Sequence, residues 1–268
     1  MTRSIPPSLA PLLALLELER PSVVTTGQLR AFVAEAGVAT PAHVVIHRLA
    51  ERGWLLATGQ RGVWEFSPAE NAGPFSRQDP WLTLRAAREA DPDVEAVVAL
   101  GSALWLLDLS DRRPDRGEIA VPPGVHASAG LARAYRVTHF RAALLPVERG
   151  GVPVHRSATV LVHLAHRPAS VRNWGAILDV LPALVDAADR GEVREELRQR
   201  GHATHVRLAY LLSGVAPDLV DELHVAPAGK VWFGPRRRLR RHNARWNIAD
   251  TVLPLDPARL RGLERLAL

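Results

Sequence analysis

The sequence predicts an α+β fold in which an N-terminal winged helix-turn-helix precedes a larger mixed α/β C-terminal domain. Three amphipathic helical segments lie within residues 9–53, and two β-prone runs joined by a glycine-containing turn follow them directly. In the remainder of the chain, strand-like runs cluster between residues 117 and 160 and helical patterns follow. The 268 residues are enough for two domains of ordinary size.

The first two helices are each defined by a stripe of apolar residues at helical spacing. The first helix is expected over residues 9–18, before Pro21 ends it. Thr25 or Thr26 can cap the second helix, and Gly37 supplies its C-terminal stop. Their buried stripes are predicted to comprise Leu9, Leu12, Leu13 and Leu16 in the first helix and Leu29, Phe32, Val33 and Ala36 in the second.

The third helix is predicted to begin with Thr40 as N-cap and Pro41 at the first helical position, and to end at Gly53. Its buried residues would be Ala42, Val45, Ile46 and Leu49. The runs WLLAT and VWEF then form a hairpin, because the glycines of the connecting GQRG permit the positive dihedrals of a tight turn. Three helices followed by a hairpin is the order typical of a winged helix.

The stretch after Phe66 is rich in Pro, Gly, Asn and Ser and lacks apolar periodicity, which is typical of a linker. We therefore predict a winged-helix DNA-binding domain at residues 1–68, a linker at 69–80 and an α+β domain at 81–268. In the last of these, strands are expected within residues 117–123, 135–140 and 152–160, and helices within 80–90, 94–107, 158–166, 173–189, 191–200, 203–212 and 217–223.

Composition excludes several classes of site. Without cysteine the chain has no disulfide and no thiolate metal site, which fits a reducing cytosol. The apolar N-terminal stretch is short and is interrupted by Glu17 and Glu19, so we expect neither a signal sequence nor a membrane span. We therefore expect a cytoplasmic protein. The net charge is +6, and nearly all the positive charge is arginine, since Lys230 is the only lysine. Arginine suits phosphate and guanine contacts.

In a helix-turn-helix the third helix enters the major groove of double-stranded DNA, and its outward side chains meet base edges. His43, His47 and Arg48 are predicted to read bases, and Val44 to meet a thymine methyl group. The further DNA-side candidates are Thr40 and Arg30 near phosphates and Gln60 and Arg61 at the wing tip, along the minor groove or backbone. A winged helix that binds protein stays the alternative, because residues 1–66 carry six arginines against five glutamates.

A second basic surface is predicted between residues 230 and 245, where no acidic residue interrupts the run. Interleaved aromatic residues would suit a phosphate-binding surface or an RNA or protein docking site, and a solvated, partly disordered turn is the alternative. The basic residues of this run are Lys230, Arg236, Arg237, Arg238, Arg240, Arg241 and Arg245.

Enzymatic sites find little support. The pair Gly101 and Ser102 resembles the start of a nucleotidyltransferase site, but Glu118 is not followed by the second acid that a two-metal site needs, so this pair is expected to open a packed helix. The pairs His163 with His166 and His202 with His205 place two rings on one helix face, yet no acidic residue completes a zinc pattern. We predict polar-core or surface histidines, no catalytic residue, no metal and no cofactor.

Several segments resemble the AbiEi-type antitoxin family of type IV toxin–antitoxin systems. They are the N-terminal winged helix, the SAL segment at Ser102–Leu104, GEIAVPPG, VPVHRSATVLVHLA and VRNWGAILDVLP. The resemblance implies a transcriptional autorepressor that binds repeats in its own promoter and whose C-terminal domain counters a nucleotidyltransferase toxin. The DNA-side positions carried over are Gln28, Arg30, Thr40, His43, His47, Arg48 and Arg61, and the basic surface of the second domain would assist.

Two other functions stay open on the sequence: a winged-helix protein whose C-terminal domain acts on nucleic acid as an enzyme, and a regulator that senses a small molecule there. Converging carboxylates or histidines in a cleft would favour the enzyme, and an apolar pocket with few polar groups would favour the sensor. Both a monomer on repeated sites and a dimer on a palindrome fit the sequence.

Overall fold

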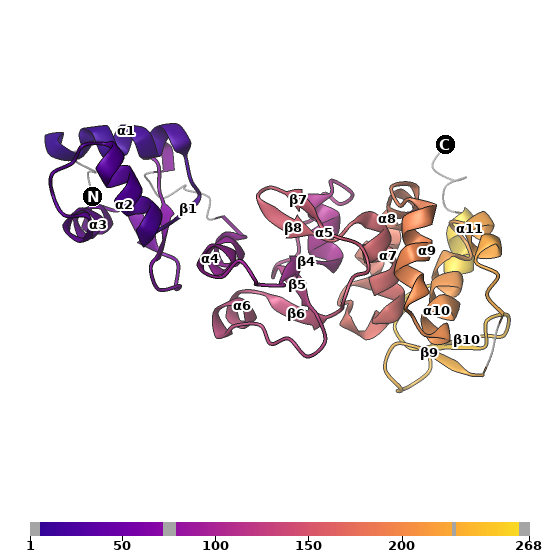
Figure 1. The fold of residues 1–268 in the computed structure, drawn as a ribbon. Coiled ribbons are helices and arrows are strands. Elements are labelled where there is room, and N and C mark those ends of the chain that lie inside the picture. Colours follow the sequence, from indigo (N-terminus) through magenta and orange to yellow (C-terminus); the bar gives the residue numbers. More distant parts are fainter. Residues whose placement is uncertain (1–5, 72–78, 227–228, 263–268) are drawn as a thin grey trace. The chain divides into compact units, whose positions relative to one another are not determined.

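The computed structural model describes residues 6–71, 79–226 and 229–262, and most of the predicted linker at 69–80 lies outside them (Figure 1). The chain packs as two compact units. Residues 1–95 and 127–134 form the first unit, and residues 96–126 and 135–268 form the second. Each unit has its own sheets and its own core.

The first unit has the topology of a winged helix, as predicted. Its elements are η1 (Pro7–Leu9), α1 (Ala10–Glu19), β1 (Val23–Thr25), α2 (Thr26–Glu35), α3 (Ala42–Glu51), β2 (Leu55–Ala57), β3 (Val63–Phe66) and η2 (Ala69–Asn71). The sheet order is β1-β3-β2 with antiparallel pairing throughout, and Val24 and Trp64 are partners in the register. The hairpin was predicted, whereas the three-residue strand β1 was not.

The core of this unit is built from the three predicted helical stripes and the hairpin. Its buried residues include Leu12 and Leu16 of α1, Leu29 and Val33 of α2, Val45, Ile46 and Leu49 of α3, and Trp54 and Phe66. Phe32, Ala36 and Ala42, which the periodicity also predicts to be buried, pack against this cluster while staying half-buried. Burial of each large apolar side chain contributes about 1.5–3 kcal/mol to folding.

The helix ends follow the predicted chemistry with one correction. Thr25 caps α2 through a capping box with Gln28, and Gly37 follows that helix with a φ of 63°. The predicted N-cap of α3, Thr40, is wrong, because the helix begins one residue later and Pro41 is the N-cap. Proline fixes only φ, and the ψ of Pro41 is extended at 137°, so that its carbonyl accepts the first hydrogen bonds, from Val44 and Val45.

Helix α4 (Leu82–Ala90) also belongs to the first unit, where it packs against β1 and β3. It buries Leu84 and Ala87, and α6 (Ala129–Ala134) packs against it. The packing units therefore differ at α4 from the predicted domains, which place residues 81 onwards in the second domain. The boundaries at 68 and 81 stay predictions.

The second unit begins with a mixed five-stranded sheet of order β6-β5-β4-β8-β7. The strands are β4 (Val97–Val98), β5 (Glu118–Val121), β6 (Arg136–His139), β7 (Val147–Arg149) and β8 (Val152–Val154). The predicted continuous helix over residues 94–107 is wrong, since β4 is followed by a turn at Leu100, with φ 51°, that opens α5 (Leu100–Leu106). The predicted strand at 152–160 likewise ends at Val154, because α7 starts at Ser157.

Helices follow the sheet, as predicted. They are α7 (Ser157–His166), η3 (Pro168–Ser170), α8 (Trp174–Asp186), α9 (Arg190–Arg198), α10 (His202–Leu212) and α11 (Pro217–Glu222). Helix α7 is central, since residues 158–165 are all buried and the helix contacts α5, α8, α9 and α10 (Figure 1). In the described part of the chain, no helix combines the length and the apolar character needed to cross a membrane.

The arginine-rich run folds into a third sheet that the sequence did not predict. Strands β9 (Val231–Phe233), β10 (Arg241–Asn243) and β11 (Ile248–Asp250) pair in the order β10-β11-β9, and η4 (Pro257–Gly262) follows. Strand β9 packs against α10. Residues 234–240 form an exposed loop between β9 and β10, so the alternative of a solvated turn stays open.

Candidate functional site

The exposed face of α3 carries the predicted base-reading side chains. His43, His47 and Arg48 are exposed, and Val44 is half-buried beside them. Residues four apart share a helix face, so His43 and His47 lie one above the other and Arg48 flanks them. The ring of His47 lies 3.2 Å from the carboxylate of Glu51, one turn further along the same face.

The wing tip presents an exposed arginine on a rigid turn. Gly59 and Gly62 flank the tip with φ values of 83° and 75°, which only glycine adopts without strain. Arg61 is exposed and Gln60 half-buried between them. The carbonyl of Gly62 accepts hydrogen bonds from the backbone N–H and the hydroxyl of Thr26, at 2.8 and 3.2 Å, which ties the wing to the start of α2.

The remaining predicted DNA-side residues lie on or next to α2 and α3. Arg30 is exposed and Thr40 is half-buried in the turn before α3. The side chain of Gln28 makes two hydrogen bonds within the protein. Its carbonyl oxygen accepts the N–H of Thr25 at 2.7 Å, and its amide nitrogen donates to Glu89 at 2.8 Å. Contact of Gln28 with DNA stays a prediction, and it would require breaking these bonds.

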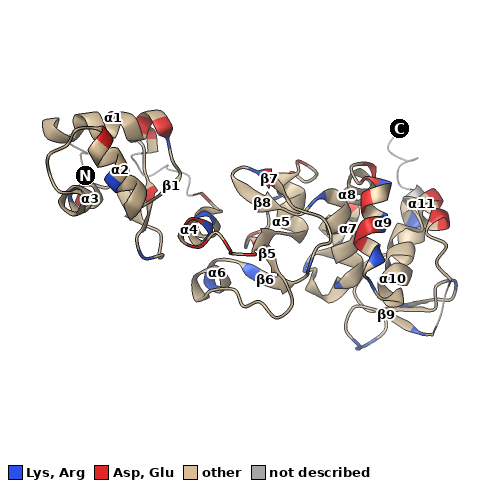
Figure 2. Ribbon diagram, in the orientation of Figure 1, with Lys and Arg blue, Asp and Glu red and all other residues tan. Residues whose placement is uncertain are grey.

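A second candidate surface is the arginine loop, residues 234–240, which joins β9 to β10 (Figure 2). Arg236, Arg237 and Arg238 are exposed, and within the described residues none of the three pairs with a carboxylate. Arg240 and Arg241, in contrast, hold the loop to its own sheet. Arg240 donates to the carbonyl of Val252 at 3.2 Å, and Arg241 pairs with Asp250 at 2.9 Å.

Asp250 is the anchor of this loop. Its carboxylate is fully buried and accepts hydrogen bonds from the Tyr210 hydroxyl at 3.1 Å and from Arg241. Its other oxygen accepts the N–H groups of Val252 and Leu253 at 2.9 Å each. Burial, followed by the charge of Asp250, raises the pKa of Tyr210. The loop that carries Arg236, Arg237 and Arg238 is therefore joined to a strand that binds the buried Asp250.

Lys230 and Arg245 complete the predicted second basic surface at its edges. The ammonium of Lys230 lies 5.1 Å from the Trp232 ring, and the guanidinium of Arg245 lies 4.9 Å from the Trp246 ring. Both distances are typical of cation–π contacts.

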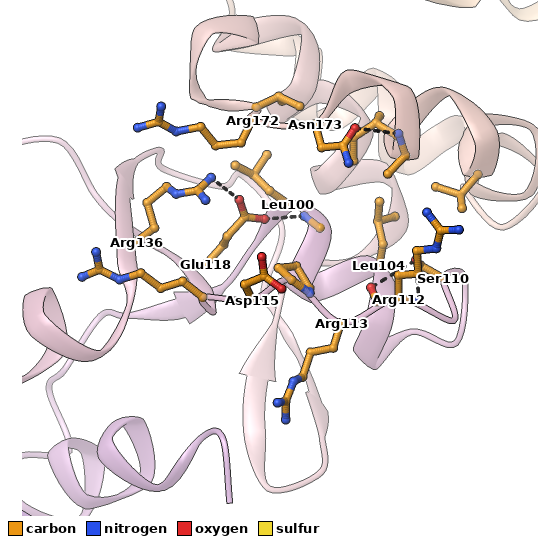
Figure 3. A pocket seen from close by; sticks show the side chains of 17 residues that line it. Leu100, Leu104, Ser110, Arg112, Arg113, Asp115, Glu118, Arg136, Arg172 and Asn173 are labelled. Atoms are coloured by element: carbon orange, nitrogen blue, oxygen red, sulfur yellow. Dashed lines mark hydrogen bonds and ion pairs between the residues drawn. The ribbon is translucent and has the colours of Figure 1, made fainter.

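A pocket of about 350 Å³ in the second unit is a third candidate site (Figure 3). At its floor, the Glu118 carboxylate of β5 accepts hydrogen bonds from Arg136 at 2.7 Å and from the N–H of Gly101 at 2.8 Å. The hydroxyl of Ser102 accepts the N–H of Glu118 at 2.9 Å. Burial raises the pKa of Glu118, and Arg136 and the two backbone contacts partly offset that rise.

These contacts settle the role of the Gly101 and Ser102 pair. As predicted, it opens a packed helix, because Ser102 is fully buried and both residues bind Glu118. The Glu118 carboxylate pairs with an arginine, and the next residues of its strand, Ile119 and Ala120, are buried and apolar.

The sequence analysis did not predict the basic lining of the pocket. Arg112 and Arg113 belong to the charged stretch DRRPDRGE, which is the feature of the sequence that could have indicated it. Arg136 of β6 and Arg172, which precedes α8, reach the same pocket from distant parts of the sequence. Only the fold brings these residues together.

Of the paired histidines of α7, predicted to be surface or polar-core residues, His163 is fully buried and His166 is half-buried. The rings of His163 and Phe140 stack with centroids 4.1 Å apart, and the His155 ring centroid lies 5.8 Å from that of His163. Burial, and secondarily the charge of Arg200, lowers the pKa of His155 to about 3 and that of His166 to about 4. These rings are therefore neutral at neutral pH.

His202 and His205 lie in α10, where His202 is exposed and the ring of His205 lies 3.1 Å from the carbonyl of Leu197. Among the residues that the structure describes, no three His, Asp or Glu side chains gather where they could hold a metal ion.

Comparison with known proteins adds the family. Residues 96–214 match the family model of the AbiEi antitoxin C-terminal domain, a range that includes the pocket and the histidines of α7. The chain is also similar to the RV2827C protein from Mycobacterium tuberculosis, whose crystal structure aligns with a TM-score of 0.77 at 26% identity over 100% of this chain and 97% of that chain. No match was found among curated proteins. The family match confirms the resemblance to AbiEi-type antitoxins, and the chain carries the C-terminal domain of that family at residues 96–214.

Proposed function

We propose that this protein is an antitoxin that represses its own toxin–antitoxin operon through the winged helix and neutralises a nucleotidyltransferase-type toxin through the second unit. The AbiEi antitoxin domain supports the antitoxin role. The proposed partners are double-stranded DNA, as repeats in the promoter, and the toxin. The activity requires neither catalysis by this chain nor a cofactor, and its place is the cytoplasm.

The observation that carries the DNA-binding part is the combination of α3 and the wing in one winged helix. His43, His47 and Arg48 share the exposed face of α3, and Arg61 stands on a turn fixed by two glycines. In DNA complexes of this motif the helix reads the major groove, and a wing arginine is attracted by the negative potential of the minor groove. A charge-assisted contact of Arg48 or Arg61 would contribute about 1–3 kcal/mol.

The arginine loop would add sequence-independent contacts to phosphates. Three exposed guanidinium groups, none of which pairs with a carboxylate of the described residues, suit phosphate oxygens, because the planar fork of arginine matches their geometry. Such contacts raise affinity equally for all sequences. Under this proposal the winged helix reads the operator and Arg236, Arg237 and Arg238 bind backbone.

A reporter gene placed behind the protein's own upstream DNA tests repression. The wild-type chain is expected to lower reporter output, and the double change Arg48→Ala with Arg61→Ala to restore it. The change Arg149→Ala removes an exposed arginine of β7 and serves as the matched control that keeps repression. Unchanged reporter output with the wild-type chain would refute autorepression.

Co-expression with the toxin encoded beside the gene tests neutralisation separately. The wild-type chain is expected to restore growth, and the Arg48→Ala with Arg61→Ala chain to restore it equally when both genes are driven by an unrelated promoter. Growth arrest despite wild-type antitoxin would contradict the proposed neutralisation and leave repression to its own test.

A further inference from the structure

The pocket of the second unit is lined by arginines and by apolar side chains. The labelled side chains Arg136 and Arg172 lie together at one end, and Leu104 lies at the other (Figure 3). Ile177 and Val180 of α8 add to the apolar lining. A volume of about 350 Å³ is in the range of pockets that enclose a small organic ligand.

At the basic end the pocket continues into a second hollow of about 230 Å³. The two hollows share Leu100, Glu118, Arg136 and Arg172. The second adds Thr138 and Ser170, whose hydroxyls are 3.3 Å apart. Arg136 and Arg172 therefore line both hollows.

The charges of this end favour an anion. The Glu118 carboxylate is nearly buried and is already bound by Arg136 and by the N–H of Gly101, so it positions Arg136. The Arg136 side chain keeps 30% of its surface exposed, which leaves guanidinium donors for a ligand. Arg172 is exposed and has no carboxylate partner among the described residues. Guanidinium groups bind phosphate oxygens in pairs of parallel hydrogen bonds.

We propose that this pocket binds a free nucleoside triphosphate, with the phosphates on Arg136 and Arg172 and the base against Leu104, Ile177 and Val180. Inorganic phosphate would leave the space beside Leu104, Ile177 and Val180 empty, and a duplex is too large to enter a volume of about 350 Å³. A nucleotide unites the two features that the lining demands, a multiply charged anion and a flat apolar body. The antitoxin domain would then respond to nucleotide, which is a function beyond repression and neutralisation.

Isothermal titration of the full chain tests the proposal, with ATP, GTP, CTP and UTP as ligands and pyrophosphate and adenosine as probes of the two halves. At least one triphosphate is expected to bind clearly more tightly than pyrophosphate or adenosine. Arg172→Ala is expected to weaken triphosphate binding by about tenfold or more, as loss of a charge-assisted contact does. Arg149→Ala, which removes an equal charge from an exposed position of β7, should leave it unchanged.

A second variant separates the two halves. Val180→Trp fills the space beside Leu104 and Ile177 from the half-buried surface of α8 and keeps the arginines. It is expected to abolish saturation transfer from protein to the base protons in NMR while pyrophosphate binding is retained. The proposal is overturned if no triphosphate binds, if pyrophosphate binds as tightly as the triphosphates, or if Arg172→Ala and Arg149→Ala have equal effects.

Discussion

At the scale of single residues, buried carboxylates organise the second unit. Glu196 of α9 is fully buried and accepts the N–H groups of Ala143 and Leu144, at 3.1 Å each, and the hydroxyl of Thr159 at 2.7 Å. Arg200 pairs with it at 3.3 Å. The sequence gives no hint of this, because Glu196 stands in the charged stretch REELR, whose pattern is typical of a solvated helix face.

Glu196→Ala is therefore expected to destabilise the protein by about 3–5 kcal/mol, because it removes the buried carboxylate that Arg200, Thr159 and two backbone N–H groups share. Urea denaturation measures the loss in the free energy of unfolding. Glu195→Ala is the matched control: the side chain of Glu195 is 40% exposed and pairs with Arg198 of its own helix, so its loss should cost less than about 1 kcal/mol. Equal losses for the two variants would contradict the assigned role.

The buried histidines make stability depend on pH. The pKa of His155 is lowered to about 3 in the folded chain, whereas the unfolded side chain titrates near 6.5. As pH falls below about 6.5 the unfolded state takes up a proton that the folded state cannot, so stability decreases until the pH approaches 3. His163, whose pKa burial also lowers, acts in the same direction.

The substitution His155→Leu removes one of the groups that take up a proton when the chain unfolds at acidic pH. Between pH 6 and 4 the slope of the unfolding free energy against pH is expected to become shallower by about 1.4 kcal/mol per pH unit. Denaturant titrations at several pH values measure this slope. His126→Leu, a change of an exposed histidine, should leave the slope as it is. A His155→Leu protein with the wild-type slope would show that His155 is protonated in the folded state.

At the scale of elements, most helices were predictable and several short strands were not. The helical repeat over residues 42–51 extends for about three turns, long enough for the periodicity to be clear. Strands β1, β9 and β10 are three residues each, and the side chains of β10 are Arg, His and Asn, which have no strand-like pattern. Pairing with the buried β11 fixes β10, and that partner is visible only in the fold.

Substitution of Gly234, at the start of the arginine loop, tests whether the loop has the backbone conformation of the structure. Its φ is 106°, and a Cβ there would lie 2.6 Å from the Thr251 hydroxyl and from a methyl group of Val252. Gly234→Ala is expected to lower stability by about 2–3 kcal/mol, since both the backbone conformation and the space oppose a side chain. Thermal unfolding followed by circular dichroism measures the change.

Gly229→Ala provides the control for that substitution, because a Cβ at Gly229 meets nothing within 4 Å. Its unfolding temperature should stay close to that of the wild type. An unfolding temperature of the Gly234→Ala protein equal to that of Gly229→Ala would contradict a rigid loop.

At the scale of the whole molecule, the chain combines a winged helix with an AbiEi antitoxin C-terminal domain. The order of elements in the first unit was predictable from helix stripes and one glycine hairpin. The packing of α4 with that unit was not, because an amphipathic helix reveals its buried face without revealing the surface that covers it. The pocket depends on Arg136 and Arg172, which are far apart in the sequence, and it lay beyond prediction for the same reason.

For the whole molecule, we expect the winged helix to read DNA sequence while the arginine loop binds the DNA phosphate backbone. The most direct measurement is the salt dependence of binding to the protein's own upstream DNA and to a scrambled duplex. It compares the wild type, Arg48→Ala with Arg61→Ala, and a variant in which Arg236, Arg237 and Arg238 are all alanine.

We expect the wild type to prefer the upstream DNA, the first variant to lose that preference, and the second to keep it while the slope of log affinity against log salt falls by about 2–3. Equal wild-type affinity for the two duplexes would contradict the account, and the α3 face and wing would then belong to a protein interface.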